Sequence, residues 1–251
     1  MNVKLLLAGV VCAGFFGGHV QAMDIGSLIG ASKQALQAVT LTDDDVRTLS
    51  EKSCVQMDRQ SKLAAANDKY SRRLATILKG FPGSVEGQKL DFKVYLTKDV
   101  NAWAMPNGCV RVYSGLMDMM DDDEVRGVIG HEIGHVALGH SKKAMQVAYA
   151  ASAAKSAAGA ADNSAIAALS NSQLGDLGEK LINSQFSQSQ ETDSDNYSFD
   201  LLTSAKLSAK GLASAFRKLA QLDGGKSSMF SSHPSSTERA KNIEQRLAAG
   251  K

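Results

Sequence analysis

Two histidines and a glutamate stand close together in the sequence, as His131-Glu132-x-x-His135. On an α-helix, residues four positions apart lie about 40° apart around the axis, so the two imidazoles share one face. Histidines placed in this way can bind one Zn²⁺, at about 2.0–2.1 Å per nitrogen. Glu132 lies about 100° round from His131, beside the metal, where a general base for a metal-activated water belongs. The alternative is a core helix whose histidines only find hydrogen-bond partners.

A catalytic zinc site needs a third protein ligand. His140 is the nearest candidate, but at nine residues beyond His131 it would lie about 180° round the helix, so we expect it to cap the helix C-terminus instead. Glu191 is the better candidate, because Asp195 follows it by one turn on the same helix face. Asp195 would then accept the far-side N–H of a ligand histidine and fix its tautomer. The alternative for this acidic pair is a solvated helix face.

This residue set predicts hydrolysis of a peptide bond. Zinc lowers the pKa of its water to about 7, and Glu132 takes the proton and later delivers it to the leaving amine. The oxyanion needs a further donor, for which His233 and Arg239 are the candidates. His233 is also a candidate fourth zinc ligand that closes the site until it is displaced. A loop histidine and a surface arginine without a role remain the alternative.

The elements that must position these residues are mainly helical. Acidic residues from Asp121 to Glu124 start the metal-binding helix, and a strand is expected from Leu90 to Leu96. Two short strands are expected between Ala102 and Tyr113, around a Pro106-Asn107-Gly108 turn. The other helices are predicted over Val46–Asp68, Lys69–Leu78, Gly115–Met120, Leu174–Leu202 with a bend near Gly178, Ser208–Leu222 and Thr237–Leu247.

The stretch from Ala144 to Ser172 is rich in Ala, Ser and Gly and thinly hydrophobic. It is predicted to be a helical excursion on the surface, and the alternative is a mobile lid over the site.

Composition indicates one sizeable domain. The 251 residues are 43% hydrophobic and 22% charged, and the net charge of +2 comes from scattered residues without a basic stripe. Nucleic acid is therefore not an expected partner.

The first 22 residues are predicted to be a signal peptide, with Lys4, an apolar run from Leu5 to Phe16, and cleavage after Ala22. Cys12 follows Val11, which does not fit a bacterial lipidation signal, so a lipid anchor is not expected. We expect residues 23–41 to form a leader segment and residues 42–251 to form the functional domain, exported to the periplasm.

Signal cleavage leaves two cysteines, Cys54 and Cys109. An even pair in an oxidising compartment is a candidate disulfide, and two unpaired buried cysteines are the alternative.

With these residues in hand, the chain resembles the HtpX and CAAX-prenyl-protease-like family of zinc metallopeptidases, which are gluzincins. It looks most similar to the exported bacterial members of the LoiP type. The resemblance extends from about Leu41 to the C-terminus and rests on six short motifs: Asn101-Ala102-Trp103-Ala104, Gly115-Leu116-Met117, His131 to His135, Ser184-Gln185-Phe186-Ser187, Glu191 to Asp195, and His233-Pro234 with Arg239.

The resemblance implies an α+β fold, a mainly helical zincin-like domain with a small β-sheet beside the H-E-x-x-H helix. It implies one Zn²⁺ held by His131, His135 and Glu191, with Glu132 as the base. Residues Asn101, Ala102, Trp103 and Ala104 resemble an edge strand that pairs with an extended substrate. An ordinary half-buried strand is compatible with that role.

The LoiP type is usually a lipoprotein, and HtpX has transmembrane segments, but neither feature is found in this sequence. Cleavage of prenylated peptides is therefore not implied, and peripheral association with the outer membrane stays open. The expected function is a periplasmic zinc endopeptidase that removes misfolded or misassembled envelope proteins. The alternative is a chaperone-like factor that binds unfolded envelope proteins with the same fold.

Overall fold

A computed structural model of the chain describes residues 41–155, 166–222, 233 and 236–250. The predicted signal peptide, and the predicted leader up to residue 40, lie outside the described residues.

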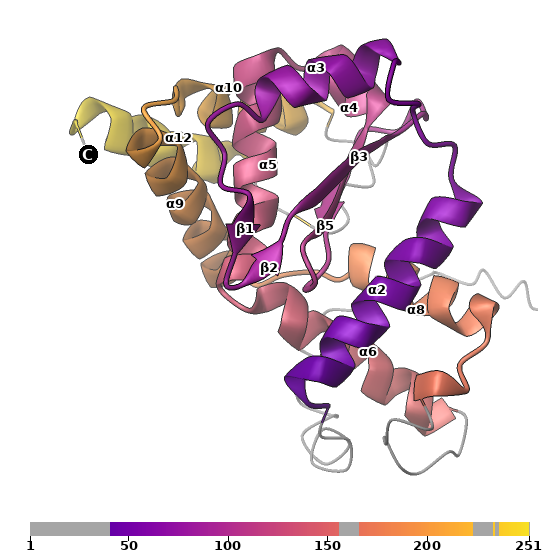
Figure 1. The fold of residues 1–251 in the computed structure, drawn as a ribbon. Helices are drawn as coiled ribbons and strands as arrows, with labels where there is room; N and C mark the ends of the chain where they lie inside the picture. The colour runs from indigo at the N-terminus through magenta and orange to yellow at the C-terminus, as the bar shows by residue number, and fades with distance from the viewer. Residues whose placement is uncertain (1–40, 156–165, 223–232, 234–235, 251) are drawn as a thin grey trace, which may run out of the picture.

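A three-stranded sheet stands at the centre of the fold (Figure 1). The strands β3 (Asp91–Tyr95), β4 (Ala102–Ala104) and β5 (Cys109–Tyr113) lie in the order β3-β5-β4. β4 and β5 are antiparallel and joined by the predicted turn, whose Gly108 has a φ of +82°. β3 runs parallel to β5, so β4 is an edge strand. A second, two-stranded hairpin, β1 (Ser84–Val85) with β2 (Gln88–Lys89), was not predicted.

Side chains alternate across the sheet and fill two hydrophobic cores. Val94, Val110 and Val112 face the first core, and Tyr95, Trp103 and Met105 face the second. The sheet therefore lies between two groups of helices (Figure 1). On the first side lie α3 (Lys69–Ile77), α4 (Ser114–Met119), α5 (Asp122–Ala137), α9 (Gln188–Ser204), α10 (Lys210–Gln221) and α12 (Ser236–Ala248); on the second lie α2 (Asp43–Gln60), α6 (His140–Lys155) and α8 (Asn171–Ile182).

Helix α5 carries the predicted metal-binding motif through the first core. Asp121 caps its N-terminus and forms a capping box with Glu124, as the acidic start predicted. Its glycines allow α9 to approach closely. A Cβ atom on Gly130 would lie 2.4 Å from Ser198 Oγ, and one on Gly134 would lie 2.9 Å from the Ser194 carbonyl oxygen. The spacing of these glycines thus places the two functional helices side by side.

Two of the predicted helices are wrong in extent. Helix α2 ends at Gln60 and not at Asp68, because residues 62–64 pair with the edge of β3 through the Ala64 N–H and the Leu96 N–H. The helix predicted over Leu174–Leu202 is two helices, α8 and α9. Ser187 starts α9 with a capping box, and Gly178, where a bend was expected, lies inside α8.

The prediction of a surface excursion over 144–172 is wrong for the part that lies in α6, whereas residues 167–172 are mostly exposed. Met145 and Tyr149 of α6 are buried in the second core, together with Ile166. Small residues such as Ala144 and Ala148 are themselves buried there, which a reading of bulk hydrophobicity does not reveal. Residues 156–165 of this stretch, on which the lid alternative depends, lie outside the described residues.

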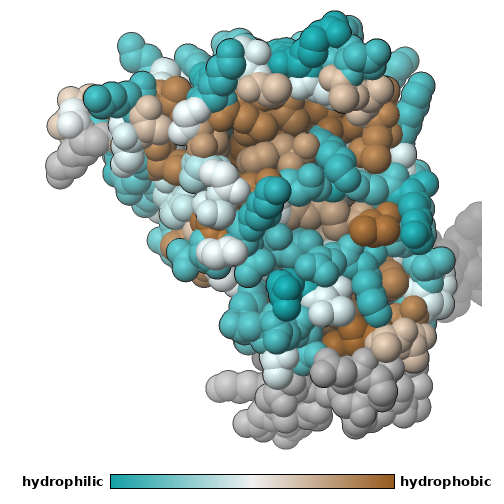
Figure 2. Space-filling model, viewed as in Figure 1, coloured by the Kyte–Doolittle hydropathy of each residue, from teal (hydrophilic) through white to brown (hydrophobic). Residues whose placement is uncertain are grey.

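None of the described helices is both long and apolar enough to cross a membrane. Figure 2 shows hydrophobic side chains gathered below α3 on one face of the molecule, with hydrophilic residues around them.

The predicted disulfide is present between Cys54 of α2 and Cys109 of β5, which are 55 residues apart in sequence. A crosslink over such a loop restricts the unfolded chain and contributes about 2–4 kcal/mol to stability. Reduction of protein starting at Met23 should therefore lower the free energy of unfolding in urea by about that amount. The Cys54→Ser/Cys109→Ser variant should show the lower value with and without reductant. Equal stability of the oxidised and reduced parent would contradict this prediction.

A buried ion pair joins the same helix to the sheet. Arg111 is fully buried, and Asp58 accepts hydrogen bonds from its Nε at 2.8 Å and from Lys93 Nζ at 2.8 Å. Burial alone would raise the pKa of Asp58, but the hydrogen bonds from Arg111 and Lys93 bring it below its usual value. The pair therefore contributes stability above the unfolded pKa of about 3.9, and this contribution is lost as the pH falls through the folded pKa.

The variant Asp58→Asn should accordingly lose stability at pH 7 and lose less as the pH falls below about 4. Urea unfolding of the parent and the variant across that range measures the difference directly. A difference that stays constant with pH would contradict the assignment.

Candidate active site

Helices α5 and α9 bring three of the predicted metal ligands together. The Nε2 atoms of His131 and His135 lie 3.0 Å apart. The Glu191 carboxylate lies 3.6 Å from His131 Nε2 and 3.4 Å from His135 Nε2. Each of the three residues is 1% exposed. Burying such polar groups is costly unless something compensates them.

This geometry fits a divalent metal. Donors at about 2.0–2.1 Å from a tetrahedral ion lie about 3.3–3.4 Å from one another, and the observed separations bracket that value. Burial holds the pKa of His135 well below its usual value, so its ring is neutral. A neutral imidazole offers a lone pair to a metal, and the glutamate supplies a negative oxygen.

His233 belongs to the same cluster, although it follows Glu191 by 42 residues in the sequence. Its Nδ1 lies 3.2 Å from His131 Nε2 and 2.9 Å from a Glu191 oxygen. One donor atom from each of these residues and from His135 lies within 4.8 Å of the others. His233 therefore stands where a fourth ligand would complete a tetrahedron.

Asp195 and Arg239 lie behind the ligands. Asp195 Oδ1 is 2.8 Å from His131 Nδ1, so the carboxylate can accept the proton on the far side of that ring. Arg239 makes hydrogen bonds of 2.8 and 2.6 Å to the two Asp195 oxygens, and its Nη1 is 2.6 Å from Glu191. Its guanidinium is thus turned toward two carboxylates, which does not favour the expected role as an oxyanion donor.

The His135 ring has two further neighbours, one on its face and one at Nδ1. Phe186 stacks on it, with the ring centroids 3.9 Å apart, and His140 Nδ1 lies 3.2 Å from His135 Nδ1. The expectation that His140 caps the C-terminus of α5 is wrong. α5 ends at Ala137, the chain turns at Gly139 with a φ of +73°, and His140 begins α6.

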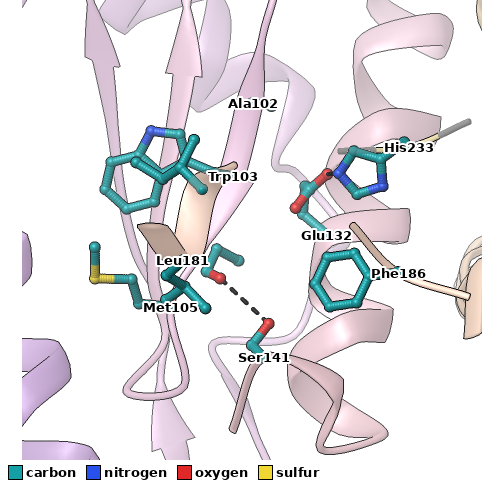
Figure 3. Close-up of a pocket in the computed structure, with 10 residues that line it drawn as sticks. Ala102, Trp103, Met105, Glu132, Ser141, Leu181, Phe186 and His233 are labelled. Atoms are coloured by element: carbon teal, nitrogen blue, oxygen red, sulfur yellow. Dashed lines mark hydrogen bonds and ion pairs between the residues drawn. The ribbon is translucent and has the colours of Figure 1, made fainter. Parts of the chain in front are cut away.

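Glu132 faces the cluster from the other side. Its side chain is buried, its Oε1 makes no hydrogen bond within the described part of the chain, and His233 Nε2 lies 3.6 Å away (Figure 3). Burial raises the pKa of Glu132 above its usual value, despite the opposing influence of His233 and His131. A carboxylate with a raised pKa is suited to exchange protons near neutral pH.

A pocket opens between Glu132 and the edge strand β4 (Figure 3). The Ser141 hydroxyl donates to the outward carbonyl of Ala104 over 3.3 Å. Asn101 lies just before the strand, where its side chain accepts from the Ala102 N–H. Sequence reasoning named the strand residues but missed several apolar and polar lining residues, which carry no motif: Met105, Ser141, Leu181 and Ile182. Phe186, also in the lining, appeared only within a family motif.

Comparisons with known proteins agree with this geometry. Peptidase family M48 matches residues 68–247. The chain is 51% identical over 250 residues to Metalloprotease LoiP of Escherichia coli (strain K12), which covers 99% of this chain and 98% of that protein. It is 47% identical over 253 residues to Metalloprotease YcaL of the same strain, covering 100% and 99% of the two chains. Protease HtpX of Actinobacillus pleuropneumoniae serotype 5b (strain L20) is 43% identical over 53 residues, 20% of this chain and 18% of that protein.

The predicted fold class is confirmed, and the similarity to LoiP and YcaL extends over the whole chain. A peptidase acts on peptide bonds, so its substrates are peptides. From the buried ligand cluster and these matches together, it follows that the chain belongs to peptidase family M48 and is a metalloprotease.

Proposed function

We propose that the protein is a zinc-dependent endopeptidase. The observation that carries the proposal is the buried cluster of His131, His135 and Glu191, with Glu132 beside it and free of hydrogen bonds at Oε1 in the described structure. Two nitrogens and one carboxylate oxygen are the protein ligands typical of catalytic zinc. When bound, zinc would supply Lewis acidity, which polarises a carbonyl and lowers the pKa of water to about 7.

The side chains of this protein supply the proton transfers. Glu132 would take a proton from the attacking water and deliver it to the leaving amine. Asp195 would hold the His131 ring in the tautomer that leaves Nε2 free to bind metal. Arg239 would fix both Asp195 and Glu191 in place, since it contacts both carboxylates.

The edge strand β4 supports the binding of an extended peptide. In an antiparallel pair, alternate residues point their backbone groups away from the partner strand, and Ala102 and Ala104 do so here. An unfolded segment could pair with this edge as an added strand by displacing the contacts that Asn101 and Ser141 make with Ala102 and Ala104. The neighbouring pocket is lined in part by Trp103, Leu181 and Phe186, so apolar residues of a bound peptide would contact these side chains beside Glu132. Apolar segments of this kind are exposed in unfolded proteins.

The cellular setting follows from the N-terminal sequence. We propose export to the periplasm after cleavage behind Ala22, and removal of misfolded or misassembled envelope proteins there. A disulfide such as Cys54–Cys109 suits an oxidising compartment. Fractionation of cells would distinguish a soluble periplasmic protein from one held peripherally at the outer membrane.

Casein cleavage tests the enzymatic proposal against the chaperone-like alternative. Protein starting at Met23 should cleave unfolded casein, lose the activity on treatment with a chelator, and regain it with one equivalent of zinc. If the protein binds casein and suppresses its aggregation without cleaving it, with or without zinc, the binding factor is the better description.

His233 provides a further prediction, because it occupies the position of a fourth ligand. Catalytic zinc sites keep one position open, whereas sites with four protein ligands are closed. We therefore expect His233→Ala to retain zinc and to raise basal casein cleavage severalfold. The opposite result, a lower kcat with unchanged zinc content, would show that His233 stabilises the transition state instead.

A further inference from the structure

Each ring of a ligand histidine has one nitrogen for the metal and one for the protein. For His131 the second nitrogen faces the Asp195 carboxylate at 2.8 Å. For His135 it faces His140 Nδ1 at 3.2 Å, and the part of the chain that the structure describes offers it no other hydrogen-bond partner. We propose that His140 is a positioning residue, whose Nδ1 accepts the proton of His135 Nδ1–H and so holds the second zinc ligand. The inference rests on the proposed zinc site.

The direction of this hydrogen bond follows from the metal site. A neutral imidazole has one N–H and one lone pair. His135 Nε2 lies among the other donor atoms, 3.0 Å from His131 Nε2, so it must carry the lone pair for the metal. The proton then belongs on Nδ1, and the partner must accept it. His140 can do so only as a neutral ring with its own proton on Nε2.

The fold holds His140 in the position that this role requires. Gly139 adopts a left-handed conformation with a φ of +73°, which turns the chain back so that the first residue of α6 faces the last turn of α5. The Ser194 hydroxyl of α9 lies 3.2 Å from the same His140 Nδ1. Three helices therefore converge on this nitrogen, and the His140 ring is half-buried between them.

The arrangement gives the two ligand histidines different support. A carboxylate at His131 adds negative charge to the ring, while a neutral imidazole at His135 orients the ring without adding charge. Loss of a hydrogen bond of this kind behind a metal ligand typically weakens metal affinity about 10–100-fold.

Two substitutions distinguish the effect of losing the hydrogen-bond acceptor from the effect of losing the volume of the His140 side chain. Asn places an amide oxygen near the position of the histidine Nδ1, and Leu fills similar space without an acceptor. Zinc affinity, measured by competition with a chromogenic chelator, should fall about 10–100-fold in His140→Leu and stay within about threefold of the parent in His140→Asn. The inference is overturned if His140→Leu binds zinc as tightly as the parent, or if both variants lose affinity equally.

A parent that binds no zinc would overturn the proposed function itself, which separates the two failures. A second measurement uses the parent protein, so it does not depend on whether a variant folds. In zinc-loaded parent protein labelled with ¹⁵N-histidine, NMR should find His140 neutral with its proton on Nε2. A proton on His140 Nδ1 would overturn the inference.

Discussion

Glu132→Gln should abolish nearly all peptide hydrolysis while leaving zinc in place. Glutamine has the shape of glutamate but cannot take a proton, and general acid–base groups typically contribute about 10²–10⁴-fold to the rate. Glu132 is not one of the clustered donor atoms, so zinc content should stay at the parent value. The measurement pairs kcat for a quenched fluorescent peptide with zinc per chain.

A matched control lies in the same helix. Glu124 is also buried, but it caps α5 and pairs with Lys218, away from the ligands. Glu124→Gln can still accept the capping hydrogen bond and should keep near-parent kcat. If Glu132→Gln retained more than a tenth of the activity, Glu132 would not be the base.

Arg239→Ala should cost far more stability than its position near the C-terminus suggests. The guanidinium contacts the buried carboxylates of Asp195 and Glu191 and lies over the Phe216 ring, 4.1 Å from its centroid. Removing it leaves two negative groups buried without their partner, a change that typically costs about 3–5 kcal/mol. Zinc affinity should also fall, because both carboxylates position or form the metal site.

An exposed arginine–carboxylate pair provides the control. Arg217 pairs with Glu244 through two contacts of 2.6 Å, but the two side chains are 50% and 41% exposed. Because ion pairs exposed to solvent contribute little to stability, Arg217→Ala should cost far less stability than Arg239→Ala. Urea unfolding of the chelator-treated and zinc-loaded variants gives both values. Equal small losses for the two arginines would contradict the buried role of Arg239.

The metal ligands and Asp195 could be predicted from the sequence because helical periodicity is a local property. The spacing of His131 and His135, and of Glu191 and Asp195, placed each pair on one helix face, and the structure places these faces together. The hairpin around Pro106-Asn107-Gly108 and the acidic start of α5 were likewise local signals. What joined the two helices was not predicted: glycines in α5 that leave room for α9.

His140 shows why the rest was missed. Its expected position, about 180° round the helix axis from His131, assumed that α5 continues to residue 140. The helix ends earlier, and the turn at Gly139 returns the ring to His135. Phe186 lies in the loop between α8 and α9, where a continuous helix was expected, and this loop brings its ring to the same histidine. Tertiary contacts also ended α2 at Gln60, where the following residues pair with β3.

The most direct test of the zinc site is X-ray absorption at the zinc edge of protein starting at Met23. We expect one zinc per chain with only nitrogen and oxygen ligands at about 2.0–2.1 Å, and with the scattering of at least two imidazoles. His135→Ala should lose one imidazole or the metal. Absence of zinc, or a sulfur ligand at about 2.3 Å, would contradict the assignment of His131, His135 and Glu191.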